Sequence, residues 1–208
     1  MLDVRKIRLI LELREAGISN SKVLSAIEKI PREEFIHKNF RNQAYENIAL
    51  PIDQNQTISQ PFVVAKMTEL LDVKSHHKVL EVGTGSGYQS AILSLLARRI
   101  YTVERIKSLY IKSEKIFEKL KITNVVCKYA DGNLGWKEQI PFDRIIITAA
   151  TSELSNLIFN HVKDGGIIVS PMIEKGKQLL IKYMIKDNKI IKEIHEDVVF
   201  VPNLKGTQ

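Results

Sequence analysis

Cysteine is nearly absent from this 208-residue sequence, in which Cys127 is the only example. An intrachain disulfide needs two cysteines, so a disulfide framework is excluded and a reducing compartment is expected. Long apolar runs are also missing: residues 1–6 lead into a charged amphipathic pattern, and no segment has the length of a signal peptide or a membrane span. These absences predict a soluble cytoplasmic protein without a membrane partner.

Patterns typical of metal sites and catalytic nucleophiles are missing as well. His76 and His77 are adjacent, so their side chains diverge, and His37 has no second histidine at helical metal spacing. Cys127 has no neighbouring histidine or basic signature and is most simply a core residue. No Gly-x-Ser-x-Gly elbow occurs. The sequence therefore predicts no metal site.

The charge is basic but dispersed. Lys and Arg number 31 against 24 Asp and Glu, which gives a net charge of +7, and no long basic block resembles a nucleic-acid arm. A field of this sign attracts anions, including carboxylates. With 44% hydrophobic residues, the chain suffices for one α/β core plus an N-terminal extension. We expect a single domain over residues 1–208, with helices and a shaped loop in residues 1–60 and the core in residues 61–208.

The clearest pattern is a glycine loop between a strand and a helix. An apolar run over residues 79–82 ends in Gly83, Gly85 and Gly87, and a helical pattern follows. Glycine permits a positive φ and close approach of a ligand, and the helix directs its first N–H groups toward that ligand. The spacing Gly-x-Gly-x-Gly differs from that of dinucleotide binders, and it favours a smaller adenosyl ligand.

Two glutamates are associated with this loop. Residues 99–103 form the next predicted strand, which ends in Glu104, where a carboxylate can receive ribose hydroxyls. Glu81 and Glu104 are thus expected at the ends of adjacent strands. The alternative is that the loop is only a turn and both glutamates are solvated; the position of Glu104 argues against it.

The remaining sequence alternates between helix and strand patterns. This alternation predicts an α/β protein with a doubly wound, Rossmann-like, mostly parallel sheet and an N-terminal helical extension, and with ligand chemistry at the carboxyl ends of the strands. Asp131 follows one such strand. The polar residues 50–61 are interpreted as a shaped loop, or alternatively as a simple connector. Helices are expected within residues 4–17, 19–27, 32–40, 61–71, 106–120 and 154–161 (closed by Gly165 and Gly166), further strands at 124–129, 142–148 and 167–169, and an antiparallel C-terminal hairpin around 186–189.

Several motifs, in order along the chain, give it a family resemblance. The chain resembles the protein-L-isoaspartate O-methyltransferases, a class of S-adenosylmethionine-dependent enzymes, from residue 30 to residue 202. The glycine loop alone would indicate only a methyltransferase, whereas Gln-Thr-Ile-Ser-Gln-Pro at residues 56–61 is the most specific match. Further matches lie at residues 67–71, 103–105, 131–136 and 141–150.

The resemblance implies a reaction and a set of site residues. Transfer of a methyl group from S-adenosylmethionine to the free α-carboxylate of an L-isoaspartyl residue would begin the repair of damaged proteins and peptides through a succinimide, without a metal. By the same resemblance, the cofactor-binding residues are Glu81, Gly83, Gly85, Gly87, Glu104, Asp131 and Gly132, the substrate-binding residues are Thr57, Ile58 and Ser59, and Ser59 is also the catalytic residue. Glu104 would hold the ribose, Asp131 and Gly132 would border the adenine, and Glu81 would support the methionine end.

The chain departs from the family in two places. Asp53 and Asn55 stand where the family usually has glycines, and both residue types tolerate a left-handed backbone well. The tail at residues 203–208 also differs from the usual sequence, which leaves its contacts with substrate or cofactor open.

Two other functions are compatible with parts of the pattern. A nucleic-acid methyltransferase would fit the basic charge, but no Asn/Asp-Pro-Pro-aromatic motif follows the fourth strand and no Pro-Cys nucleophile is present. A non-catalytic binding module of the same fold would not need Ser59, Glu104 and Asp131 together. We therefore expect a monomer that acts on isoaspartyl proteins and peptides and not on nucleic acid.

Overall fold

The computed structural model of the chain describes residues 3–187 and 189–208. The hairpin turn expected around residues 186–189 includes Asn188, which lies outside the described residues. None of the helices in this described part combines the length and the apolar character that crossing a membrane requires.

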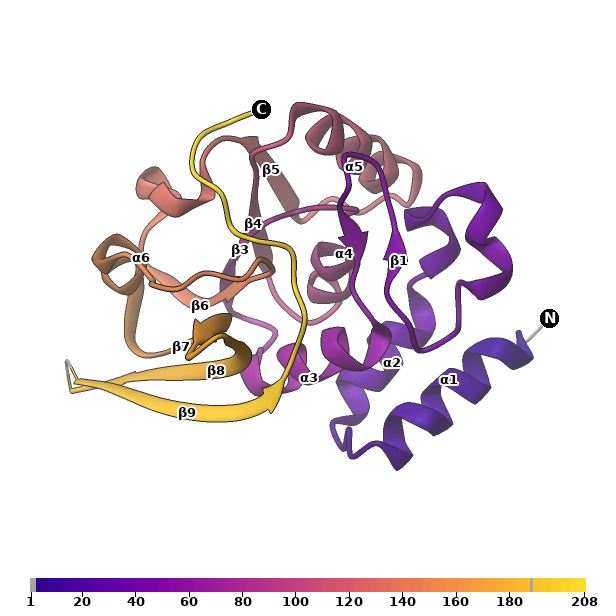
Figure 1. Cartoon of the computed structure of the whole chain (residues 1–208), viewed down its shortest axis with the longest axis horizontal. Coiled ribbons are helices and arrows are strands. Elements are labelled where there is room, and N and C mark those ends of the chain that lie inside the picture. Colours follow the sequence, from indigo (N-terminus) through magenta and orange to yellow (C-terminus); the bar gives the residue numbers. More distant parts are fainter. Residues whose placement is uncertain (1–2, 188) are drawn as a thin grey trace.

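A mixed seven-stranded sheet, formed by the described residues, lies at the centre of the molecule (Figure 1). Its strand order is β5-β4-β3-β6-β7-β8-β9, with parallel pairing from β5 to β7 and antiparallel pairing of β7 with β8 and of β8 with β9. The predicted Rossmann-like sheet with an antiparallel C-terminal hairpin is therefore confirmed. The strands are β3 Lys78–Val82, β4 Arg99–Glu104, β5 Val125–Tyr129, β6 Phe142–Ile147, β7 Val162–Glu174, β8 Lys177–Lys186 and β9 Lys189–Asp197.

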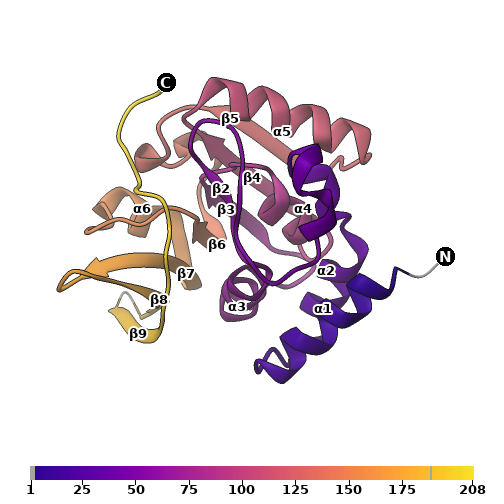
Figure 2. The ribbon, with the colours of Figure 1, turned by 45° about the vertical axis from the view of Figure 1, so that its right-hand side comes forward.

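Helices cover both faces of the sheet because its central strands are apolar on both sides. On one face, Val79 of β3 and Ile146 of β6 pack with α3 (Pro61–Leu71) and α4 (Tyr88–Ser94). On the other face, Leu80 and Ile145 pack with α6 (Asn156–His161). The helix α5 (Lys107–Lys119) lies beside β4 and β5, and Figure 2 shows these layers from the side. Continuous apolar strands of this kind are typical of a parallel sheet covered on both faces.

The N-terminal helices α1 (Val4–Glu15) and α2 (Ser21–Lys29) pack beside α3 and α4 (Figure 1). Asn20 caps α2 by accepting hydrogen bonds from the backbone N–H groups of Lys22 and Val23. Buried residues of α1 and α2 belong to the same apolar cluster as buried residues of α4 and α5. The N-terminal extension is thus continuous with the core around the sheet.

The helix predicted within residues 32–40 is present as two short 3-10 helices, η1 (Arg32–Phe35) and η2 (Lys38–Gln43). The predicted loop that follows contains an antiparallel pair formed by β1 (Leu50–Pro51) and β2 (Thr57–Ile58). The turn between β1 and β2 has positive φ at Gln54 and Asn55 but not at Asp53. The Asp53 carboxylate instead accepts hydrogen bonds from His37 Nε2 (2.6 Å) and Lys112 Nζ (2.8 Å).

The prediction that Gly165 and Gly166 close the helix before them is wrong. The helix α6 ends at His161, β7 begins at Val162, and both glycines lie in an irregular part of β7 where its register with β6 shifts. A Cβ atom at Gly166 would lie 2.3 Å from Val162 Cγ2 and 2.7 Å from the carbonyl oxygen of Lys163, so the glycine permits the tight fold of the chain within this part of β7.

Candidate active site

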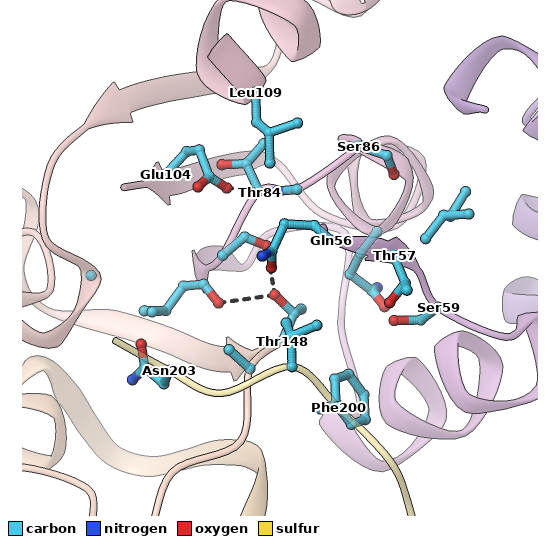
Figure 3. Close-up of a pocket in the computed structure, with 18 of the residues that line it drawn as sticks. Gln56, Thr57, Ser59, Thr84, Ser86, Glu104, Leu109, Thr148, Phe200 and Asn203 are labelled. Carbon is cyan, nitrogen blue, oxygen red and sulfur yellow. Dashed lines mark hydrogen bonds between the residues drawn. The ribbon is translucent and has the colours of Figure 1, made fainter. Parts of the chain in front are cut away.

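A cavity lies at the carboxyl ends of β3, β4 and β6 (Figure 3). The loop after β3, the end of β4, the end of β6, the strand β2 and the C-terminal segment line it. The cavity opens to solvent at its mouth. Ligands of doubly wound sheets bind at this position.

The predicted glycines have different structural roles. Gly83 (φ 98°) and Gly85 (φ 53°) line the cavity, and a Cβ atom at Gly85 would have no heavy atom within 4 Å. A Cβ atom at Gly83 would lie 2.4 Å from Thr148 Oγ1, which donates hydrogen bonds to the carbonyls of Val82 and Gly83. Gly87 is not a lining residue; a side chain there would meet the Phe117 ring at 2.9 Å. The loop therefore leaves open space for a ligand at Gly85, whereas Gly83 accommodates Thr148 and Gly87 accommodates the Phe117 ring.

Glu104 is placed as the sequence predicts, at the end of β4 and in the wall of the cavity. Its side chain is 4% exposed, Oε2 accepts a hydrogen bond from the Gly85 N–H, and Oε1 accepts one from the Ile106 N–H, each at 2.8 Å. Burial raises the pKa of Glu104, while these backbone donors oppose that shift. Each oxygen retains a free lone pair, so the carboxylate can accept hydroxyl groups of a ligand.

Glu81, which the resemblance predicts to support the methionine end of a cofactor, is not among the residues that line the cavity. The side chain points from β3 toward α4, is 0% exposed, and accepts a hydrogen bond from Ser90. Its other oxygen has no partner among the described residues. Burial raises the pKa of Glu81 to about 8, so the buried carboxyl is largely protonated near neutral pH.

Asp131 and Gly132 lie at the end of β5, but only Gly132 lines the cavity. The Asp131 carboxylate accepts hydrogen bonds from the backbone N–H groups of Asn133 (2.9 Å) and Gly206 (2.7 Å). Although partial burial opposes the effect, these donors hold the pKa of Asp131 below its usual value. The structure thus gives Asp131 a second task that the sequence did not predict: it anchors the C-terminal tail.

The residues predicted for the acceptor, Thr57, Ile58 and Ser59, all line the cavity. Ile58, the last residue of β2, is buried, whereas Ser59 is half-buried. Ser59 Oγ makes no hydrogen bond to another described residue, which leaves it available to a ligand. In Figure 3, Thr57 and Ser59 lie on the side of the cavity opposite Glu104.

The C-terminal segment, whose contacts the sequence did not predict, forms one wall of the cavity. Figures 1 and 2 show it leaving β9 and crossing the ends of the central strands, and Figure 3 shows Phe200 and Asn203 beside the cavity. The backbone of Ala150 donates to Val201 O (2.8 Å) and accepts from Asn203 N (2.7 Å), so one isolated parallel bridge holds the segment beyond the end of β6. No local pattern in residues 200–208 indicated this pairing, because its partner is a single residue distant in sequence.

Several other residues line the cavity. Gln56, Thr84, Ser86 and Ile106 lie within two positions of predicted site residues, and extending each motif would have found them. Leu109 of α5 and Thr148 after β6 lie farther from any predicted site residue.

The cavity fits S-adenosylmethionine. One wall contains the Glu104 carboxylate, which can accept hydroxyl groups, and Gly85, where the absence of a side chain leaves open space. The apolar residues Ile106 and Leu109 also line the cavity. This combination suits a ligand with a polar ribose beside a flat, less polar ring. Across residues 3–187 and 189–208, no cluster of three or more His, Cys, Asp or Glu side chains is arranged to hold a metal ion.

Solved structures resemble the chain over most of its length. A structure of a protein-L-isoaspartate O-methyltransferase has a TM-score of 0.87 and 27% identity, covering 95% of this chain and 65% of that one. A Plasmodium falciparum structure described as a protein-L-isoaspartate O-methyltransferase in complex with S-adenosyl-L-homocysteine has a TM-score of 0.85 and 25% identity, covering 96% of this chain and 98% of that one.

Sequence comparisons identify the family. The protein-L-isoaspartate O-methyltransferase of Maricaulis maris is 47% identical and covers 98% of this chain and 96% of its own length. The enzyme of the same name from Parvibaculum lavamentivorans is 48% identical, with 98% and 93% covered. The family model of protein-L-isoaspartate(D-aspartate) O-methyltransferase matches residues 4–208. The chain therefore belongs to the protein-L-isoaspartate(D-aspartate) O-methyltransferase family.

Proposed function

We propose that the cavity binds S-adenosylmethionine against Glu104 and the glycine loop, and the acceptor carboxylate against Ser59. The family uses S-adenosylmethionine to methylate L-isoaspartyl residues in protein repair. The observation that supports these residue roles is the placement of Ser59 and Glu104 on opposite sides of one cavity. A donor and an acceptor bound there would meet between the two side chains.

The cofactor-binding roles are divided among residues that line the cavity. Glu104 accepts the ribose hydroxyls, Gly83 and Gly85 permit close approach to the loop, and Gly132 borders the adenine. Bound S-adenosylmethionine supplies a methyl group on a sulfonium centre. Asp131 acts through the position of Gly132 and the tail, because it does not line the cavity and its carboxylate accepts hydrogen bonds from Asn133 and Gly206.

The acceptor side positions a group that is already reactive. An α-carboxylate is ionised near neutral pH, so the chain needs no base to activate it. Ser59 Oγ can donate one hydrogen bond and thereby select one carboxylate oxygen. The segment at Phe200 and Asn203 excludes water from one side. Alignment and exclusion of water are then the main contributions of the protein.

The pH profile tests the absence of a catalytic base. For an isoaspartyl peptide without histidine, kcat/KM is expected to show no base-controlled rise between about pH 6 and 8. Initial rates of labelled methyl transfer across this range measure it, with a thermal melt at each pH as control. A rise with unit slope in the folded enzyme would show that a titrating enzyme group is required.

Glu104→Ala tests the cofactor side. Removal of a charged acceptor for the ribose hydroxyls is expected to weaken S-adenosylmethionine binding by roughly 1.5 to 3 kcal/mol. Calorimetry measures the dissociation constant, and Glu138→Ala, which removes an exposed carboxylate outside this cavity, is the matched control. An unchanged dissociation constant for folded Glu104→Ala would remove Glu104 from the cofactor site.

We also propose that the chain works as a cytoplasmic monomer with one domain, and that it acts on proteins and peptides and not on nucleic acid or membranes. Support comes from the apolar cluster shared by the N-terminal helices and α4, and from a cavity that one chain lines by itself. Light scattering tests the monomer. Labelled methyl transfer to an isoaspartyl peptide, compared with transfer to RNA or DNA, separates this activity from a nucleic-acid methyltransferase and from a non-catalytic binding module.

A further inference from the structure

Arg32 is a fully buried arginine whose charged group contacts backbone carbonyls. Its side chain, on η1, is 0% exposed. Among the described residues, no carboxylate forms a salt bridge with it. Nη1 donates to the carbonyl of Ala44 (2.9 Å) and more weakly to that of Glu46 (3.4 Å). Nη2 donates to the carbonyls of Ile48 (2.9 Å) and Ser59 (3.1 Å).

These four carbonyls belong to the segment that leads to the acceptor side of the cavity. The segment runs from the end of η2 through β1 and β2, and Ser59 follows β2 directly. One guanidinium therefore holds the start of the segment and its functional end at the same time. Because the Ser59 contact is made through its backbone carbonyl, Ser59 Oγ remains free to face the cavity.

The same guanidinium contacts the cofactor side. It lies 5.8 Å from the centroid of the Tyr88 ring, and Phe35 of the same 3-10 helix meets that ring edge-to-face at 5.5 Å. Tyr88 is the first residue of α4, follows Gly87 directly, and lines the cavity. Arg32 thus touches both the backbone that carries Ser59 and the residue that follows the glycine loop.

The geometry favours arginine over any other side chain at this position. A buried charge is costly, so an interior without a further requirement would be more stable with an apolar side chain. The planar guanidinium presents several donors in a rigid fork, whereas lysine has a single ammonium on a flexible stem. Only the fork can reach carbonyls of the segment from Ala44 to Ser59 while its face packs on Tyr88.

We propose that Arg32 is a positioning residue for methyl transfer, which fixes the distance between Ser59 and the glycine loop by holding the Ser59 carbonyl against Tyr88. This inference rests on the proposed role of Ser59. Arg32 touches neither substrate, and it acts only through the placement of Ser59. Methyl transfer is slowed when a reacting group is slightly out of alignment, so loss of Arg32 should lower kcat.

The chain contains a matched control, Arg144. This arginine is 7% exposed and also donates to backbone carbonyls, which are those of Leu71 (2.7 Å), Asp72 (3.3 Å), Asp143 (2.9 Å) and Gly165 (3.4 Å). It lies on β6 opposite Val79 and is not a lining residue of the cavity. Arg144→Lys therefore removes a comparable buried guanidinium that makes no contact with Ser59.

The experiment compares wild type, Arg32→Lys and Arg144→Lys. Melting temperature, S-adenosylmethionine affinity, and kcat and KM for an isoaspartyl peptide are measured well below each melting temperature. Arg32→Lys is expected to lower kcat by about tenfold or more while the cofactor dissociation constant changes less than about threefold. Arg144→Lys is expected to lower the melting temperature and leave kcat unchanged.

Other outcomes overturn the proposal in distinguishable ways. A wild type that does not methylate the isoaspartyl peptide would overturn the proposed function itself. An active wild type with a normal kcat in Arg32→Lys, or with kcat lowered equally in both variants, would reduce Arg32 to a stabilising residue. Should Arg32→Lys not fold, Arg32→Gln, which keeps two amide donors, is held to the same criteria, and failure of both to fold also assigns Arg32 to stability alone.

Discussion

Ser59→Ala is expected to lower kcat/KM for an isoaspartyl peptide by about ten- to several hundredfold, while S-adenosylmethionine binds with nearly unchanged affinity. Ser59 Oγ lines the cavity across from Glu104 and makes no hydrogen bond to another described residue. Its loss therefore leaves the rest of the site intact. A lost hydrogen bond to a charged group costs roughly 1.5 to 3 kcal/mol, which sets the lower part of the range.

The chemistry limits what this hydroxyl can do. A donor to the acceptor carboxylate stabilises it most while its negative charge is complete, before the charge is cancelled in the transition state. Such a bond alone does not accelerate the displacement. Its value lies in orienting one carboxylate oxygen toward the methyl carbon, where misalignment adds further loss.

The measurement pairs labelled methyl transfer with calorimetry of cofactor binding. Ser94→Ala is the control, because Ser94 donates to the carbonyl of Ala91 within α4 and does not line the cavity. Both parameters should stay normal in that variant. Near-normal transfer in Ser59→Ala, or an equal loss of cofactor affinity, would move Ser59 out of the acceptor site.

The parts of the fold that local patterns encode could be predicted from the sequence. The strand, glycine loop and helix at residues 78–94 are adjacent along the chain, and Glu104 ends a β-branched strand, so both follow from periodicity and turn chemistry. Parallel strands with helical crossovers then bring Gly85 and Glu104 together, and the 2.8 Å hydrogen bond between them follows from that topology.

The direction of Glu81 could not be predicted in the same way. Successive side chains of a strand point to opposite faces, so Glu81 shares a face with Val79 and not with Leu80 or Val82. Because both faces of β3 are buried, the apolar pattern does not indicate which face a polar residue joins. The contact with Ser90 on α4 settles it.

Long-range pairings were also outside the reach of the sequence. The two-residue strands β1 and β2 are too short for a recognisable alternation, and one buried arginine holds the residues on either side of the pair. The C-terminal segment pairs with Ala150, and Asp131 accepts from Gly206, across more than 50 residues of chain in each case. Such contacts depend on the assembled core and leave no local pattern.

Glu81→Gln is expected to make the protein more stable than wild type at alkaline pH, with an advantage that disappears in acid. The Glu81 carboxyl is fully buried, and its pKa rises from 4.5 to about 8 because burial disfavours the charged form. A group whose pKa is raised by folding contributes stability that is fully present when the pH lies below its pKa in the unfolded chain. That contribution is lost as the pH rises through its pKa in the folded protein. Wild type should therefore lose stability between about pH 4.5 and pH 8 that the glutamine variant retains.

The size of this effect follows from the shift. Each pKa unit corresponds to about 1.4 kcal/mol, so a shift from 4.5 to about 8 predicts a relative gain for Glu81→Gln of roughly 3 to 6 kcal/mol across that window. Denaturant unfolding of both proteins at several pH values measures the difference, with Glu138→Gln, a change at a fully exposed carboxylate, as the control. A difference that does not grow with pH would mean that Glu81 is ionised in the folded protein at neutral pH.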